Sequence, residues 1–293
     1  MSERETNNTI LVPIDFSEIS MNALDHAVQL AKIYKNEITL LYIFEERPIA
    51  SILGLGKQNV ELIDAIKVKM DTVINPLVQE HGITIKKEVL EGRIYKTIVS
   101  MAEEGKYDSI VMGTSGAHRM ERIMGSNASK VIRHSTVPVI VVKDKQEETG
   151  YEKIVLPIDL TLETRQKVVW AIHIAKKFDS TIHVIFETET DEFVRDKINA
   201  TVNNVKRMLS DEGVKYEVRS LDDENYPENF SVDTIQYSDE INADLIIIMT
   251  QQEKNFSEHI IGSYAQQVVN LSSKTPVMCI TPKPSGQSVN VGY

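Results

Sequence analysis

The sequence predicts an α/β protein built from two tandem open parallel five-stranded sheets with helices on both faces. The first observation is an internal repeat, because TILVPID at 9–15 recurs as KIVLPID at 153–159, which is 144 residues later. TVPVIVV at 136–142 likewise recurs as TPVMCI at 275–280. Between these motifs, short apolar runs alternate with segments of helical periodicity, an order typical of parallel sheets covered by helices.

The first repeat begins with a β-branched run at 10–14, which predicts a buried strand. Ser17 can cap the following helix, whose apolar residues from Leu24 to Tyr34 fall on one face. Pro76 predicts a kink or a break in the next helix, because proline removes a backbone hydrogen bond. The other elements expected in this repeat are strands at 38–44, 83–90, 109–112 and 137–142 and helices at 59–81, 95–104 and 127–134. The second repeat predicts strands near 153–158, 181–186, 214–220, 244–249 and 276–281.

The polar stretch KDKQEETG at 143–150 has the composition of an exposed linker between the two repeats. A chain of 293 residues is also long for one compact domain, which usually holds about 100–200 residues. We therefore predict one domain at 1–145, a second domain at 151–284 and a C-terminal tail at 285–293.

Charge and composition disfavour several classes of partner. With 32 Lys and Arg against 43 Asp and Glu, the net charge of −11 argues against nucleic acids and anionic membranes. No apolar run reaches the ~18 residues that span a bilayer, and the polar N-terminus does not resemble a signal peptide. The one cysteine, Cys279, precludes an intrachain disulfide. We expect a cytoplasmic protein without membrane or nucleic-acid partners, and the spacing of its histidines predicts no metal site.

Three strand ends of the first repeat carry residues suited to a ligand. Ligands of open parallel sheets bind at the carboxyl ends of the strands, where the strand order reverses. Glycines there let backbone N–H groups approach a phosphate, and the start of a helix adds partial positive charge. An acidic residue after the first strand can accept hydrogen bonds from a ribose or an adenine. The candidate residues are Pro13, Ile14, Asp15, Ile43, Met112, Gly113, Gly116, Gly125, Ser126 and Asn127.

At these positions the chain resembles the universal stress protein family. The resemblance rests on PIDFS after the first strand, MGTSG after the fourth, GS before a helix and VPVIVV as the fifth strand, and it covers the chain twice. It implies a Rossmann-like sheet, similar to that of the adenine nucleotide alpha-hydrolases, and a stress-response protein that binds ATP, with Mg²⁺ held by the phosphates. By this resemblance, Asp15 and the backbone of Ile43 would hold adenosine with Met112 and Gly113 nearby, and Gly116, Gly125, Ser126 and Asn127 would face phosphates.

The two repeats depart from the family pattern to different degrees. ATP-binding members have three glycines separated by two and then nine residues, whereas only the eight residues 117–124 fill the second gap here. In the second repeat, Met249 and Gln252 replace the first two glycines, and Glu187 occupies the position of Ile43. The resemblance therefore implies a nearly intact site in the first repeat and a degenerate one in the second.

The net charges of the two repeats also favour a nucleotide site in the first repeat over one in the second. Residues 1–145 carry 18 basic and 19 acidic side chains, a net charge of −1, whereas residues 146–293 carry 14 and 24, a net charge of −10. An acidic unit without the glycines is a poor host for a polyphosphate. We predict that nucleotide binds the first unit and that the second is a structural or partner unit. By resemblance, the fifth strands would pair the units as an intramolecular pseudo-dimer, and two chains could associate as a homodimer.

Other interpretations remain open at this stage. Gly113 and Gly116 could serve a tight turn that needs positive φ, Asp15 and its counterpart Asp159 could cap helices, and Ser126 and Ser263 could be N-caps. The alternative function is an interaction module that binds no nucleotide or binds another small ligand. A third class, an enzyme of the alpha-hydrolase type, would need an SGGxDS-like loop where this chain has PIDFS. No catalytic base is marked, so nothing beyond slow ATP hydrolysis is predicted.

Overall fold

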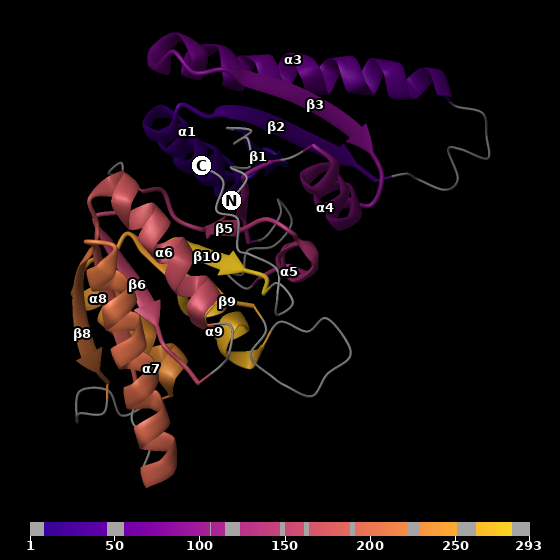
Figure 1. Ribbon diagram of the computed structural model, residues 1–293. Coiled ribbons are helices and arrows are strands. Elements are labelled where there is room, and N and C mark those ends of the chain that lie inside the picture. Colours follow the sequence, from indigo (N-terminus) through magenta and orange to yellow (C-terminus); the bar gives the residue numbers. More distant parts are fainter. Residues whose placement is uncertain are drawn as a thin grey trace. The chain divides into compact units, whose positions relative to one another are not determined.

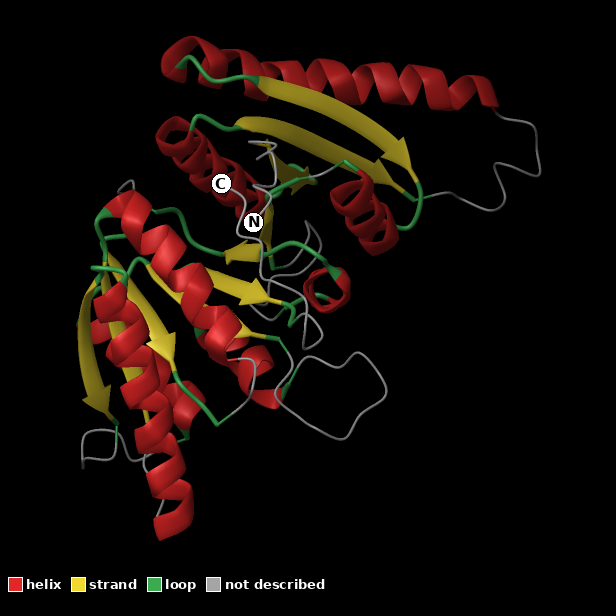
Figure 2. Ribbon diagram, viewed as in Figure 1, coloured by secondary structure: helices red, strands yellow, loops and turns green. Residues whose placement is uncertain are grey.

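The computed structural model describes residues 9–45, 56–105, 107–114, 124–146, 150–160, 164–187, 191–221, 229–250 and 262–282, with the backbone alone at 56–59. The chain divides at residue 150 into two compact units, which are described separately below. Both units alternate strands and helices along the chain (Figure 2). No helix in these ranges is both long and apolar enough to cross a membrane.

The first unit is an open parallel sheet with the strand order β3-β2-β1-β4-β5. Figure 1 labels β3, β2, β1 and β5 of this sheet. Helices α1 and α3 pack on one face, and α4 and α5 pack together on the other. The strands are β1 (Thr9–Ile14), β2 (Glu37–Phe44), β3 (Ile85–Glu91), β4 (Ser109–Gly113) and β5 (Val139–Val142). The helices are α1 (Glu18–Tyr34), α3 (Gly56–His81), α4 (Ile94–Glu104) and α5 (Ser126–His134).

The second unit repeats this topology, with the strand order β8-β7-β6-β9-β10. Its helices α6 and α7 pack against one face of the sheet, and α8 and α9 share the other. The strands are β6 (Lys153–Pro157), β7 (Thr181–Phe186), β8 (Lys215–Ser220), β9 (Leu245–Met249) and β10 (Val277–Ile280). The helices are α6 (Thr164–Phe178), α7 (Glu192–Asp211), α8 (Phe230–Glu240) and α9 (Ser263–Leu271). The predicted fold class, two tandem parallel α/β units, is confirmed.

Small residues bring the first helix of each unit close to its sheet. Ala23, Ala27 and Ala31 of α1 are buried, and Ala171 and Ala175 of α6 repeat the last two of these positions. The strands beneath them are almost wholly apolar, as expected for a sheet covered on both faces. The core of each unit therefore forms between its central strands and its first helix, which fixes where the strand ends lie.

The long helix α3 corrects one expectation, because it continues through Pro76 without a break. Pro76 and Thr72, whose carbonyl loses its usual helical partner, are both exposed, so water can satisfy that carbonyl. The helix is also anchored on its inner side by Ile66, Met70 and Ile74, which are buried at a spacing of four residues. Packing on the sheet therefore outweighs the local cost of the proline.

Candidate functional site

A pocket of about 440 Å³ lies in the first unit where β1, β2 and β4 end and α5 begins. Since β1 lies between β2 and β4, this is the point where the strand order reverses. Nine of the ten residues selected from the sequence line the pocket, and the tenth, Gly116, lies outside the described residues. The pocket is also lined by residues that the sequence did not indicate: Ser20, Leu41, Tyr42, Ile94, Ile98, Thr114 and Ala128.

Asp15 is exposed at the mouth of this pocket and is held by the turn that follows it. Its Oδ1 accepts hydrogen bonds from the Ser17 amide at 3.0 Å and from the Ser17 hydroxyl at 2.5 Å. The Ser17 Oγ in turn accepts from the Ser20 amide at 3.3 Å and is the N-cap of α1. Ser17 was correctly predicted as the cap, and the alternative that Asp15 caps the helix is wrong. Asp15 instead orients the cap.

Ile43 reaches the pocket because β2 is longer than β1. The pairing of β1 with β2 ends at Ile14 opposite Tyr42, so Ile43 extends beyond it while still pairing with Leu90 of β3. The Ile43 backbone on the β1 side thus lies at the pocket, beside Pro13 and Ile14. This is the arrangement in which a main-chain group can meet the edge of a planar base.

Gly113 is required by close packing and not by positive φ. A Cβ at this position would lie 2.6 Å from Cγ2 of Ile19 and 3.3 Å from the Ile19 backbone, in the first turn of α1. Its backbone is outside the left-handed region, so the expectation of a strained turn at Gly113 is wrong. The glycine lets the end of β4, which lines the pocket, lie against α1.

Helix α5 begins at the pocket without a capping side chain. Its N-cap is Gly125, so the alternative that Ser126 is the cap is wrong, and Gly262 likewise replaces Ser263 as the cap of α9. The Gly125 amide donates to the Thr114 carbonyl at 2.7 Å, which removes it from the donors expected to face a phosphate. The amides of Ser126 and the two residues after it begin the helix, where N–H groups and the helix dipole favour an anion.

Thr114 is a pocket residue that the sequence prediction missed. Its side chain is fully buried, and no hydrogen-bond partner for its hydroxyl occurs within the described ranges. The signal available in the sequence was the motif MGTSG, in which Thr114 directly follows Gly113 at the end of the fourth strand. Thr250 of the second unit has the same burial and the same unsatisfied hydroxyl, so this feature alone does not distinguish the two units.

In the second unit, aromatic side chains occupy the corresponding place. Phe230 begins α8 as Ile94 begins α4, and Tyr264 follows Ser263 as Asn127 follows Ser126. The Phe230 and Tyr264 rings stack with their centroids 5.3 Å apart and their planes 23° apart. The Tyr264 hydroxyl also lies 3.0 Å from the hydroxyl of Thr234. Burial raises the pKa of Tyr264, and the carboxylates of Asp159 and Glu187 add to the shift.

A lysine engages the counterpart of Asp15 in the second unit. Lys167, which replaces Ala23, is 1% exposed and donates from Nζ to the carbonyl of Pro157 at 2.5 Å. The same Nζ lies 3.7 Å from Oδ2 of Asp159, whose Oδ1 accepts from the Thr164 hydroxyl at 2.8 Å. Burial lowers the pKa of Lys167, and Asp159 opposes that shift. Asp159 therefore has an internal cationic partner, while its interpretation as a helix cap stays a prediction because residues 161–163, directly before α6, lie outside the described residues.

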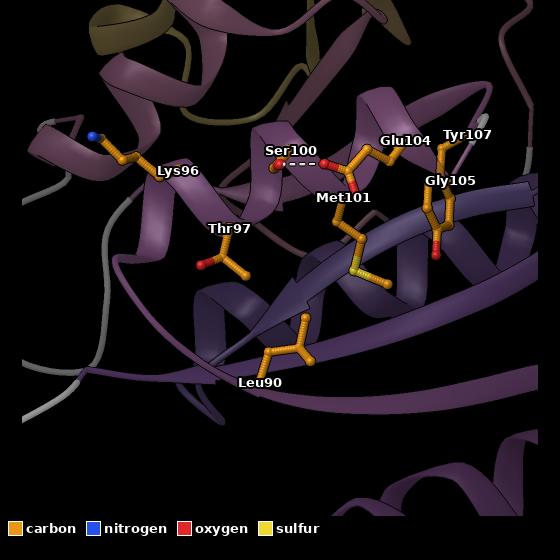
Figure 3. A pocket seen from close by; sticks show the side chains of 8 residues that line it. All are labelled: Leu90, Lys96, Thr97, Ser100, Met101, Glu104, Gly105 and Tyr107. Carbon is orange, nitrogen blue, oxygen red and sulfur yellow. Dashed lines mark hydrogen bonds between the residues drawn. The ribbon is translucent and has the colours of Figure 1, made fainter.

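A second hollow, of about 600 Å³, runs along α4 beside β3 (Figure 3). Leu90, Met101 and Tyr107 give it an apolar lining, and the Ser100 hydroxyl bonds to Glu104 at 2.9 Å within the helix. None of the residues selected from the sequence lies in it. Although it is larger, it contains no helix start, so the smaller pocket at the strand ends is the better candidate for an anionic ligand.

Comparisons with known proteins agree with the repeat. The model of the universal stress protein family matches residues 6–143 and again 150–281. Universal stress protein MJ0531 of Methanocaldococcus jannaschii is 34% identical over 142 residues, covering 47% of this chain and 84% of the relative. Universal stress protein MJ0577 of the same organism is 32% identical over 154 residues, covering 46% of this chain and 94% of the relative.

Solved structures match the fold over nearly the whole chain. A universal stress protein from Archaeoglobus fulgidus superposes with a TM-score of 0.74 at 20% identity, covering 94% of this chain and 98% of that protein. Protein PA1789 from Pseudomonas aeruginosa, described as functionally unknown, gives a TM-score of 0.64 at 19% identity, covering 94% and 92%. At these identities the likeness supports the tandem α/β architecture.

Proposed function

Because this chain belongs to the universal stress protein family, we propose that its first unit binds ATP and that the protein is a nucleotide-responsive stress regulator. The observation that carries this proposal is the convergence of Asp15, Ile43 and the uncapped start of α5 on one pocket. A carboxylate suits ribose hydroxyls, and a helix start suits phosphates. Because no catalytic base is marked, binding and not dedicated catalysis is the proposed activity, in a protein that we place in the cytoplasm.

The residues present fit an adenine nucleotide in kind and in size. The pocket volume of about 440 Å³ lies within the usual range of about 300–1,000 Å³ for small-ligand sites. Apolar walls from Ile94, Ile98 and Met112 suit a flat base, and the buried Thr114 hydroxyl supplies a further polar group. ATP would bring Mg²⁺ bound to its phosphates, which would reduce the charge that the helix start must offset.

The second unit supports the proposal by contrast. Its stacked Phe230 and Tyr264 stand where the first unit has a pocket wall and a helix start. Its Asp159 is engaged by Lys167 and its Glu187 adds negative charge near Tyr264. We propose that this unit binds no nucleotide and serves a structural or partner role. Pairing of the two units through their fifth strands, and association of two chains, remain part of the proposal.

Calorimetric titration of the purified chain with Mg·ATP tests this function. We expect one site per chain, since larger side chains stand in the second unit at positions that line the pocket in the first. Asp15→Ala should weaken binding by at least tenfold, because the carboxylate is the polar group placed for the ribose. Absence of binding at millimolar ATP, or a stoichiometry of two, would contradict the proposal.

The alternative of an interaction module that binds no nucleotide rests on two observations, the loop that is one residue shorter than the family signature and the degenerate motif of the second unit. Gly116→Val distinguishes the two functions, because Gly116 belongs to that loop. Loss of ATP binding in this variant would support the nucleotide site. A partner captured equally by the wild type and by Gly116→Val, with or without ATP, would support the module.

A further inference from the structure

Phe16 lies next to Asp15 with a backbone conformation that aromatic residues rarely adopt. Its φ is +63°, in the left-handed region. Three other non-glycine residues of the described ranges share this region, and each follows the end of a helix, where it is common: Lys35, Asp179 and Asn242. Phe16 instead lies between a strand and a helix start, so the surrounding contacts must hold it there.

Two side chains from other elements hold the Phe16 ring. The ring of Tyr42, on β2, lies 5.4 Å from it at an interplanar angle of 32°. The Lys69 ammonium, on α3, lies 4.1 Å from the centroid of the Phe16 ring, within the range of a cation–π contact. Tyr42 also lines the candidate pocket, whereas Lys69 does not. Phe16 therefore connects α3 to the mouth of the pocket.

The two residues that follow Lys69 on α3 fix the position of its backbone. The neighbouring Met70 is fully buried against the sheet, and Asp71 pairs with Lys87 of β3 at 2.5 Å. At the corresponding position of the second unit, Leu160 replaces Phe16, is 40% exposed and has no positive φ, so the described part of that loop has no aromatic ring to hold. The contact is thus a property of the unit that has the pocket.

We propose that Lys69 and Phe16 form a latch through which helix α3 sets the nucleotide affinity of the first unit without touching the nucleotide. The proposal rests on the proposed function of the pocket. When the ring is seated between Tyr42 and Lys69, the turn presents Asp15 and Ser17 in the observed geometry. Only the molecules in which the Phe16 ring is seated in this way can bind nucleotide. A weaker latch lowers the fraction of such molecules and therefore raises the apparent Kd. By reciprocity, bound nucleotide stabilises the docking of α3.

Two charge-matched variants of α3 test the latch. Lys69→Gln removes the cation above the ring, and Lys67→Gln removes the same charge from a nearby exposed position of the helix. We expect Lys69→Gln to weaken Mg·ATP binding about threefold to fivefold, the effect of losing an exposed cation–π contact, while Lys67→Gln binds as the wild type does. Phe16→Tyr should preserve affinity and Phe16→Leu should weaken it. Equal affinities of both glutamine variants would overturn the latch while leaving the proposed function intact.

Hydrogen exchange in the ligand-free protein tests the latch independently of the proposed function. The amides of Ser17, Ser20 and Met21 report the turn, because they bond to Asp15 Oδ1, Ser17 Oγ and the Ser17 carbonyl. We expect Lys69→Gln to exchange these amides about threefold faster than Lys67→Gln. If the wild type binds no ATP, the proposed function fails but this comparison still decides the latch. Identical exchange in the two variants would overturn it.

Discussion

The first unit has a pocket at the end of β4, whereas the second unit has larger side chains at the corresponding positions. Gly113, Ile94 and Asn127 line the pocket, and their counterparts Met249, Phe230 and Tyr264 are larger in each case. The sheet order and the first helix are nevertheless the same in both units. The same sheet order therefore accommodates small or large side chains at these three positions, and under the proposed function these side chains would decide which unit binds a ligand.

Introducing the two aromatic side chains of the second unit into the first unit should have the largest effect on ATP affinity. Ile94→Phe combined with Asn127→Tyr recreates the stacked pair of Phe230 and Tyr264, and should reduce ATP affinity at least 100-fold by occupying the pocket. Calorimetry measures the loss, and circular dichroism verifies the fold. As a control, Phe230→Ile in the second unit should leave the affinity unchanged. Wild-type affinity in the double variant would show that nucleotide binds elsewhere.

The second largest effect that we expect is a difference between the two units in how their stability depends on pH. His26 of α1 is buried, and burial lowers its pKa to about 4, whereas Trp170 occupies this position in the second unit. Because the folded pKa lies below the unfolded value of about 6.5, the neutral form is favoured by folding. Stability is then complete above about pH 6.5 and falls towards pH 4, by up to ~3 kcal/mol.

Urea unfolding between pH 7 and pH 5 measures this difference. Trp170 is the one tryptophan of the chain, so its fluorescence follows the second unit, while amide exchange follows the first. We expect His26→Leu to flatten the pH dependence of the first unit. The second unit retains some dependence, because burial also lowers the pKa of the less buried His173 to about 4. An unchanged pH profile in His26→Leu would exclude His26 as the cause.

Replacing Gly113, the last residue of β4, should have the smallest of these effects. Gly113→Val places a Cβ 2.6 Å from Ile19 Cγ2 and should destabilise the first unit by about 1–3 kcal/mol. Adding Ile19→Ala removes the closest contact and should restore part of the loss. Met249→Leu, a conservative change at the buried counterpart, should cost less than about 1.5 kcal/mol. Thermal unfolding measures all three, and a neutral Gly113→Val would show that α1 can shift freely.

The central strands and the residues at their ends were predictable from the sequence, since these strands are short buried apolar runs and the pocket forms where β1, β2 and β4 end. The internal repeat and the family motifs then selected nine described pocket residues. Gly116 lies outside the described residues, so its place remains a prediction. The break at Pro76 was wrongly expected because local preference does not include the packing of Ile66, Met70 and Ile74 on the sheet.

Features that depend on contacts between distant segments were not predictable. Phe230 and Tyr264 are 34 residues apart in the chain, and neither carries a local signal for stacking. Lys167 appears as one lysine of a predicted helix, and its burial against Pro157 follows only from how α6 lies on β6. The reason for Gly113 was misjudged in the same way, because its neighbour Ile19 belongs to another element.

The buried ammonium of Lys167 also has a consequence for how the two halves respond to their surroundings. It is covalently part of the chain, so the charge beside Asp159 is present at every concentration of metabolite. A unit that binds a soluble ligand becomes more stable against unfolding as the ligand concentration rises. A unit whose counter-ion is one of its own side chains, as Lys167 is, does not respond in this way. Under the proposed function, one polypeptide would therefore combine a unit whose stability follows the nucleotide concentration with a unit whose stability does not.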